Sequence, residues 1–411
     1  KMKYFFIKLF SFFLAFSFFS VSYAKEAEVV HWWVSGGEQA AISEFAKAWE
    51  AKGNIWIDTA ITGGENARGT TVNRIMGGDP PTAAQFNISR QFEDLITQGK
   101  LQSLEELATK EGWRNFIYPK KLIDVCVRDG EFWCVPVNIH SAQWMWTNTS
   151  VFKNAGVAEP DTIDDFLAAA PKLKASGIIP LALGGQPWQE GLMFGVVFSS
   201  EGYDLMQAVL KDHDTGAAKG PRFRNVLENY RELQQWVDDG APGRLWNDAT
   251  AMVIQGKAGM QIMGDWARGE FQVAGLAPKN EYNCIIPGKK KYVELGGDVF
   301  VFPKSDDPAV KEAQYELASL MVNPTVQANF NNAKGSLPMR LDVDMSAADA
   351  CMKMGLELIK DPDHIMEGSG IWNTNDFVSS WEDIISEFRN NPDQSIDDTI
   401  NQVVDLLESG I

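Results

Sequence analysis

Beyond its first 24 residues, the chain alternates short runs of β-branched and aromatic residues with longer segments of helical periodicity. Residues 28–34 form such a run, and glycines at 36 and 37 separate it from residues 38–52, whose apolar positions recur at helical spacing (Ile42, Phe45 and Trp49). The pattern predicts a strand, a loop and a helix. This order is the opening of an α/β unit.

The same alternation continues along the chain. The pattern predicts further strands at 56–62, 82–86 and 143–148, helices at 70–77, 90–98 and 161–176, and a hairpin at 125–137. Strands separated by helices indicate the α/β class, with open sheets covered by helices on both faces. Such sheets bind ligands beyond the carboxyl ends of their strands, and the loop after Trp33 is such a place.

The first 24 residues have the pattern of a secretory signal peptide. Lys1 and Lys3 precede an apolar run at 4–19, and Ser22-Tyr23-Ala24 matches the small-x-small cleavage site. A retained membrane anchor is the alternative, but the run is short for a bilayer span. We therefore expect a protein exported to a periplasm, with residues 1–24 removed.

Composition narrows the choice of function. The 411 residues are 45% hydrophobic and 22% charged, a globular balance, and they are enough for two domains. The net charge of −18 argues against a nonspecific binder of nucleic acid or anionic membranes, because both surfaces would repel the chain. The 14 Trp residues either fill cores or form flat apolar platforms for a ligand.

The four cysteines favour disulfides, because an exported chain meets an oxidising compartment and no C-x-x-C is present. Cys126 and Cys134 flank a turn and could meet across a hairpin, which leaves Cys284 to pair with Cys351. Other connectivities, and four buried free thiols, are the alternatives.

Common catalytic and cofactor motifs are absent. The sequence contains no P-loop, G-x-G-x-x-G, H-E-x-x-H or G-x-S-x-G. Only four His are present, and no two are close in sequence. A lone His is more often structural than a ligand, so we predict neither a metal site nor a cofactor.

Aromatic and polar residues gather at the predicted strand ends. Trp32 and Trp33 follow the first strand, and Glu38 stands in the first turn of the next helix, whose dipole favours an ionised carboxylate. Indoles stack on the C–H faces of a pyranose, whereas carboxylates and amides bind its hydroxyls. The alternative to ligand binding is core packing for Trp33. For Glu38, the alternative is an ordinary acidic residue at a helix start.

Other loops repeat this pairing of aromatic and polar residues. They contribute Gln85, Asn87, Trp188, Trp246, Asp265, Trp266, Asp298 and Lys334. Each alone is a weak signal, because polar residues beside glycine usually mark turns. Their number in one chain favours a site for a neutral sugar.

These strings together resemble periplasmic sugar-binding proteins of ABC transporters, in particular the glucose-binding members of the maltose-binding-protein superfamily. The resemblance runs from residue 31 to about 340 and rests on the stretches 31–38, 78–81, 135–140, 179–188, 256–266 and 334–338. The Trp32-Trp33 pair and the string Gln186-Pro187-Trp188 are specific to the sugar branch.

The resemblance implies two α/β lobes, each an open sheet flanked by helices, that close on one sugar. Three hinge crossings near Val137, Pro287 and Lys334 would join them. The N-terminal lobe would comprise residues 25–137 and 288–334, and the C-terminal lobe residues 138–287 and 335–411.

The resemblance also implies roles for individual residues. Glu38, Asp298 and Lys334 match the hydroxyl-binding acid, aspartate and lysine of relatives, and Gln85 matches a binding glutamine. Asn87 stands where relatives have Lys or His, and no counterpart of their late histidine aligns with the segment around Trp372. We include Trp372 and His140 in the predicted ligand-binding set.

The function implied is delivery of a neutral monosaccharide, such as glucose, to the permease subunits of an ABC transporter by a monomeric binding protein without catalysis. Two alternatives are an exported glycoside hydrolase, which also uses indoles and paired carboxylates, and a sugar sensor for a chemoreceptor.

Overall fold

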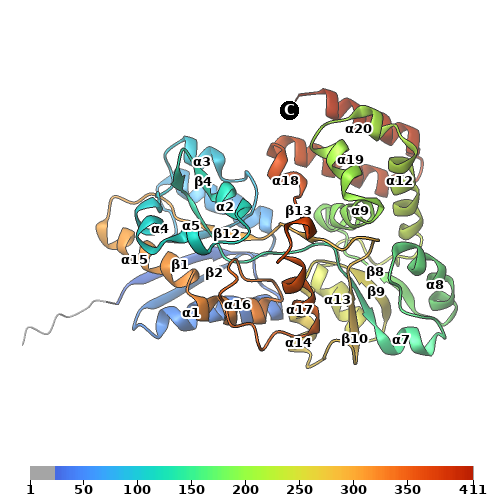
Figure 1. Ribbon diagram of the computed structural model, residues 1–411, viewed down its shortest axis with the longest axis horizontal. Helices are drawn as coiled ribbons and strands as arrows, with labels where there is room; N and C mark the ends of the chain where they lie inside the picture. The colour runs from blue at the N-terminus through green and yellow to red at the C-terminus, as the bar shows by residue number, and fades with distance from the viewer. Residues whose placement is uncertain (1–23, 411) are drawn as a thin grey trace, which may run out of the picture.

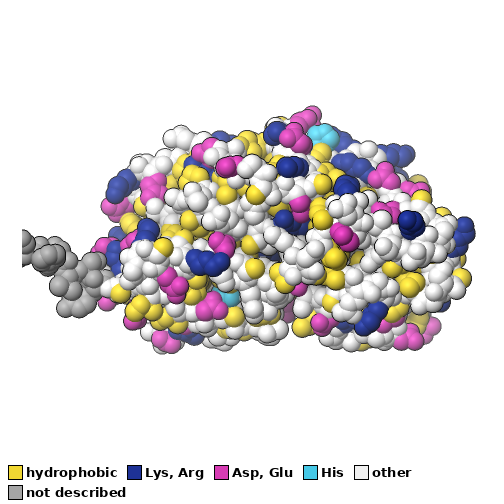
Figure 2. Space-filling model, turned by 90° about the horizontal axis from the view of Figure 1, so that it is seen from below, with side chains coloured by type: hydrophobic (Ala, Val, Ile, Leu, Met, Phe, Trp, Pro, Cys, Tyr) yellow, Lys and Arg dark blue, Asp and Glu magenta, His cyan; other side chains and the backbone are white. Residues whose placement is uncertain are grey.

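The computed structural model describes residues 24–410, and Figure 1 shows two lobes lying side by side. The predicted signal peptide, except Ala24, lies outside the described residues. Among residues 24–410, no helix has both the length and the hydrophobicity that a membrane crossing requires. Acidic and basic side chains are interspersed over the face drawn in Figure 2.

The first lobe is built on a five-stranded mixed sheet. Its order is β2 (Ile55–Ala60), β1 (Glu26–His31), β3 (Ala83–Asn87), β12 (Asp298–Val301) and β6 (Cys134–Pro136). β1 pairs in parallel with β2 and β3, whereas β12 is antiparallel to β3 and β6. The late strand β12 thus lies between two strands from the first third of the chain.

Eight helices belong to this part of the described chain. They are α1 (Gly36–Glu50), α2 (Gly64–Gly77), α3 (Glu93–Thr97), α4 (Glu105–Glu111), α5 (Trp113–Phe116), α6 (Lys121–Cys126), α15 (Pro308–Met321) and α16 (Pro324–Lys334). Phe45 of α1 stacks on Phe330 of α16, with ring centroids 4.4 Å apart. The apolar face that the sequence predicts on α1 therefore packs against α16, the last helix of this lobe in the sequence.

The second lobe contains a four-stranded sheet of order β10 (Tyr282–Ile285), β7 (Met145–Asn148), β9 (Ala258–Ile262) and β8 (Ile179–Ala182). Its helices are α7 (Thr149–Asn154), α8 (Ile163–Ala175), α9 (Pro187–Glu201), α10 (Tyr203–Leu210), α11 (Thr215–Ala218), α12 (Pro221–Gln234), α13 (Trp246–Ile254), α14 (Ala267–Val273), α19 (Asn375–Asn390) and α20 (Ile396–Glu408). The predicted α/β class is confirmed.

Between the lobes lie α17 (Ala350–Leu358), the 3₁₀ turn Pro362–His364, β13 (Ile365–Met366) paired with β11 (Val293–Glu294), and α18 (Ser369–Trp372) (Figure 1). Three chain segments run together here. Ile139 pairs with Leu337, and His140 pairs with Gly296, through backbone hydrogen bonds of 2.7–3.1 Å. The lobes are therefore joined by a small three-segment ladder.

Two sequence predictions need correction. The segment 125–137 is not one hairpin: Val125 and Cys126 end α6, and only the short pair β4 (Val127–Arg128) and β5 (Glu131–Phe132) forms a hairpin, before β6 joins the main sheet. The helix predicted at 70–77 begins earlier, at Gly64. Its first turns carry Gly, Glu, Asn and Arg, so apolar periodicity does not mark the start.

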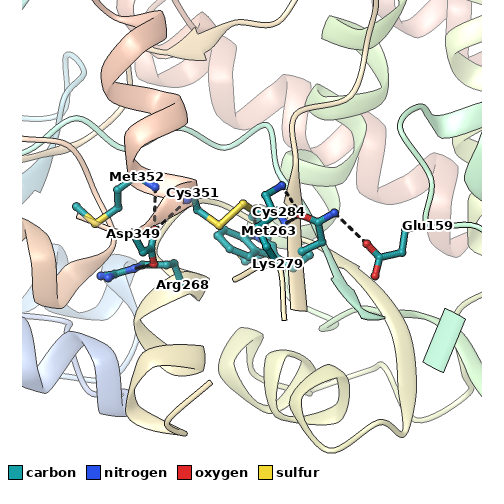
Figure 3. The surroundings of a disulfide bond; sticks show 10 residues. Glu159, Met263, Arg268, Lys279, Cys284, Asp349, Cys351 and Met352 are labelled. Carbon is teal, nitrogen blue, oxygen red and sulfur yellow. Dashed lines mark hydrogen bonds and ion pairs between the residues drawn. A yellow bond between two sulfur atoms is a disulfide. The ribbon is translucent and has the colours of Figure 1, made fainter. Parts of the chain in front are cut away.

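Both predicted disulfides are present. Cys126 is joined to Cys134, and Cys284 of β10 is joined to Cys351 of α17. Figure 3 shows the second bond beside the ion pair of Arg268 with Asp349, the residue that caps α17. The bond and the ion pair attach α17 to the second lobe.

The Cys284–Cys351 disulfide should stabilise the fold more than Cys126–Cys134. The residues of the two pairs are 67 and 8 positions apart in the sequence. Loop-closure entropy then gives about 4 kcal/mol for the long loop and about 2.5 kcal/mol for the short one. We expect guanidinium denaturation to give a larger loss of unfolding free energy for the variant with Cys284→Ala and Cys351→Ala than for the variant with Cys126→Ala and Cys134→Ala. The reverse order would contradict the prediction.

Candidate functional site

His140 lies at the centre of a buried charged network where the chain passes between the two sheets. Its Nδ1 is 2.7 Å from Oδ1 of Asp265, and its Nε2 is 2.7 Å from Oδ2 of Asp298. Asp298 begins β12 in the first lobe, whereas Asp265 follows β9 in the second. The imidazole therefore bridges strand ends of both lobes.

Asp298 is held by further polar side chains of its own lobe. Its Oδ1 accepts a hydrogen bond from Nε2 of Gln85 at 2.7 Å, and its Oδ2 accepts one from Nδ2 of Asn138 at 2.8 Å. Oε1 of Gln85 in turn accepts from the backbone amide of Trp32 at 3.0 Å. The sequence prediction missed Asn138, although this residue lies in the stretch 135–140, on which the family resemblance rests in part, two residues before His140.

The surroundings set the ionisation of this network. Burial opposes a charge on His140, but Asp298 and Asp265 outweigh it and raise the pKa of the imidazole. Burial would also raise the pKa of Asp298, but His140 and Lys334 hold that pKa below its ordinary value. For Asp265, burial dominates and raises the pKa. In residues 24–410, no group of three or more His, Cys, Asp or Glu side chains is arranged to hold a metal ion.

Glu38 and Lys334 form a second buried pair in the first lobe. Nζ of Lys334 lies 3.3 Å from Oε1 of Glu38, and both side chains are buried. Ser35 caps α1, and Glu38 returns the capping box by accepting from the Ser35 amide at 3.3 Å. The sequence predicts a helix from residue 38, and the structure begins it two residues earlier, at Gly36. The Glu38 carboxylate has partners on both oxygens.

Trp33 lies in the core of the first lobe. Only 1% of its surface is exposed, and its ring centroid is 5.8 Å from that of Phe300 and 5.4 Å from that of Phe330. Nζ of Lys334 lies 5.4 Å from the Trp33 centroid. This placement favours the core-packing alternative for Trp33. Its neighbour Trp32, in contrast, is only half-buried.

In the second lobe, half-buried indoles lie beside the charged network. The Trp266 ring is 5.1 Å from the His140 ring in an edge-to-face arrangement, and the Trp188 ring is 6.4 Å from Trp266. Any side chain at Gly264 would collide with the Trp266 indole, which explains the glycine in Gly264-Asp265-Trp266. Trp246 packs against the same apolar cluster as Trp188 and Trp266.

Asn87 and Trp32 lie at the carboxyl ends of β3 and β1. Asn87 is the ladder partner of Asp298. Arg68 of α2, which the sequence prediction missed, donates from Nη1 to Oδ1 of Asn87 at 3.1 Å and lies over the Trp32 ring. No motif marks Arg68, because its helix start carries no apolar periodicity.

Trp372 contacts a different set of residues. Its ring stacks on Tyr203 at 6.3 Å, Nζ of Lys211 lies 5.7 Å from the ring, and Nε1 donates to Glu367 at 2.8 Å. These contacts tie the indole to α10 and the neighbouring loop. They lend no support to the ligand-binding role predicted for Trp372.

Comparisons with known proteins identify relatives of this chain. The model of the family described as "Bacterial extracellular solute-binding protein" matches residues 33–328. A "Probable sugar-binding periplasmic protein" of Brucella suis is 40% identical over 340 residues, covering 82% of this chain and 80% of the relative. One of the same description from Rhizobium meliloti is 39% identical over 337 residues, covering 81% of each chain. The solved structure of a "Chitin oligosaccharide binding protein" aligns with a TM-score of 0.76 at 18% identity, covering 93% of this chain and 98% of the other.

Replacing Trp33 tests its place in the core. We expect Trp33→Ala to lower the free energy of unfolding by about 3–5 kcal/mol, since a buried indole leaves a large cavity. The control is Trp32→Ala, whose half-buried ring should cost less. Chemical denaturation measures both, and similar small losses would return Trp33 to the candidate ligand contacts.

His140 should titrate above its ordinary pKa of about 6.5. The charge on His140 then stabilises the fold fully below that pH, and this stabilisation is lost as the pH rises through the folded-state pKa. Each unit of difference between the folded and unfolded pKa values of His140 corresponds to about 1.4 kcal/mol. NMR titration of selectively labelled histidine, assigned with variants of the other three, measures this. A His140 pKa below 6.5 would contradict the charged bridge.

Glu294 supplies the control for this pH dependence, because burial raises its pKa to about 7. Its contribution to stability is present below about pH 4.5 and is lost as the pH rises through about 7. Glu294→Gln should therefore remove the decline in unfolding free energy below pH 7 and leave the decline due to His140.

Proposed function

The chain belongs to the family of bacterial extracellular solute-binding proteins, and on this premise we propose that it binds a neutral monosaccharide between its lobes and delivers it to an ABC transporter permease. The observation that carries the proposal is the junction at His140. Half-buried indoles of the second lobe meet there with Asp298 and Gln85 of the first. A sugar ring needs such apolar faces and such hydroxyl partners.

The binding groups come from both lobes, so a ligand that contacts both favours the closed form by its differential affinity. The lobes are proposed to be residues 25–137 with 288–334, and 138–287 with 335–411. The chain passes from β10 to β12 between Ile285 and Asp298, a segment that includes the proposed crossing at Pro287. Export to the periplasm with removal of residues 1–24, and a monomeric state, are part of the same proposal.

The energetics of this proposal are modest. A micromolar Kd corresponds to about −8 kcal/mol. Hydrogen bonds to charged groups contribute about 1.5–3 kcal/mol each, so a few of them plus stacking suffice after ordering costs. An ionised carboxylate has about four lone-pair sites, and Asp298 therefore keeps capacity for a ligand hydroxyl beside its protein donors.

The test is a thermal-shift screen of D-glucose, D-galactose, D-xylose, maltose and chitobiose, followed by calorimetry on any sugar that raises the melting temperature. We expect a monosaccharide to give the largest shift. A larger shift with a disaccharide would change the substrate class, and no shift with any sugar would remove the proposed function. Release of the aryl group from nitrophenyl glycosides would contradict the binding role.

Asp298→Asn should weaken the affinity for the best sugar by about 10- to 100-fold, because it removes a charged hydrogen-bond acceptor. The matched control is Asp306→Asn, an exposed residue of the loop after β12. Calorimetry measures both. Unchanged affinity in Asp298→Asn, with a fold verified by circular dichroism, would place the ligand elsewhere.

A further inference from the structure

Arg68 of α2 lies beside two of the predicted ligand-binding residues with most of its hydrogen-bonding capacity unused. Its one hydrogen bond within residues 24–410 goes to Asn87, and its guanidinium carbon lies 5.5 Å from the centroid of the Trp32 ring. No carboxylate of the described residues forms an ion pair with it within 4.0 Å. A guanidinium has five N–H donors, so four of them have no partner in this part of the chain.

Glu382 of α19 is the corresponding group in the second lobe. It is half-buried, and within the described range 24–410 its carboxylate has no hydrogen bond or ion pair. Burial and the charges of Glu65 and Asp383 raise its pKa, whereas Arg68 lowers it. Arg68 and Glu382 therefore interact electrostatically from opposite lobes without touching, and α2 and α19 stand in different lobes in Figure 1.

An unpaired charge that loses water is costly unless another group replaces the lost hydrogen bonds. A sugar hydroxyl can do this for both residues, because its oxygen accepts from a guanidinium and its hydrogen donates to a carboxylate. Resting on the proposed function, we propose that Arg68 and Glu382 are a pair of ligand-binding residues that clamp hydroxyls of the sugar from the two lobes. Two adjacent hydroxyls on one ring would suit the pair.

The charges around the pair also affect selectivity. Glu65 and Glu382 both act on Arg68, so two carboxylates accompany one guanidinium. A sugar acid placed here meets a net negative charge, which disfavours it relative to the neutral sugar. The clamp therefore selects neutral sugars over uronic acids, and this selectivity distinguishes it from a merely structural role.

The test compares Glu382→Gln and Arg68→Gln with wild type by calorimetry, using D-glucose, or the best sugar of the screen if glucose does not bind. Each variant should weaken binding by about 10-fold or more, as expected for loss of a charged hydrogen bond. The controls remove the same charges away from the pair: Asp405→Asn, exposed on α20, and Lys153→Gln, exposed on α7. Both should bind within twofold of wild type.

The selectivity readout uses the uronic acid of the same sugar. Glu382→Gln should narrow the ratio of Kd values between the uronate and the neutral sugar, because it removes one repelling carboxylate. Glu382 contacts neither Asn87 nor Trp32, so this variant tests the clamp even if Arg68→Gln disturbs the fold. If wild type binds sugar but both variants bind within twofold with an unchanged ratio, the clamp is wrong and the proposed function stands. If wild type binds no sugar, both are wrong.

Discussion

The bridge from His140 to two buried carboxylates is the constraint on which the rest of the site depends. Removing a charge from water costs several kcal/mol, and the cost is recovered only when partners are well placed. Asp265 and Asp298 stand at strand ends of different sheets, and one imidazole lies 2.7 Å from each. The bridge therefore links the geometry of the lobes to the protonation of one residue. The backbone ladder of Ile139 with Leu337 and His140 with Gly296 lies at the same place. His140 therefore belongs both to the connection between the lobes and to the charged network of the site.

The lobes also meet where the start of α1 approaches α14. Gly37 at the start of α1 lies so close to the backbone of Gly269 in α14 that a Cβ would come within 2.7 Å of it. Its amide donates to Glu270 at 2.7 Å, which places an anion at the N-terminal end of a helix from the other lobe. This contact is short and polar, so its separation exposes little apolar surface. Water can replace its hydrogen bond, and this suits the opening of the lobes that the proposed function requires.

The sequence predicted local structure well where the pattern was strong, as in the helices α1 and α8, and it predicted both disulfides. It failed where long-range packing decides. The segment at 125–137 carries hairpin residues, yet helix α6 extends into it. The pair Trp32-Trp33 could not be divided between ligand and core, because β12 and α16, which bury Trp33, come more than 260 residues later in the chain. For the same reason, the sequence did not single out Asn138, whose partner Asp298 lies 160 residues later.

The tryptophans show how one residue type serves both purposes. Six of the 14 are buried (Trp33, Trp49, Trp113, Trp144, Trp146 and Trp381), and they fill the cores of the two lobes. Trp32, Trp188 and Trp266 remain half-buried, and the Trp266 ring lies against the buried charged groups, where His140 and Lys334 face three carboxylates, Asp265, Asp298 and Glu38. An anionic ligand entering such a site would add its charge to the excess of carboxylates and would disturb pairs that are costly to break. A neutral ligand adds none, and its hydroxyls can exchange hydrogen bonds with the network one at a time. Under the proposed function, these buried charges, more than any single residue, favour a neutral, hydroxyl-rich ring with apolar faces for the indoles over an anionic ligand.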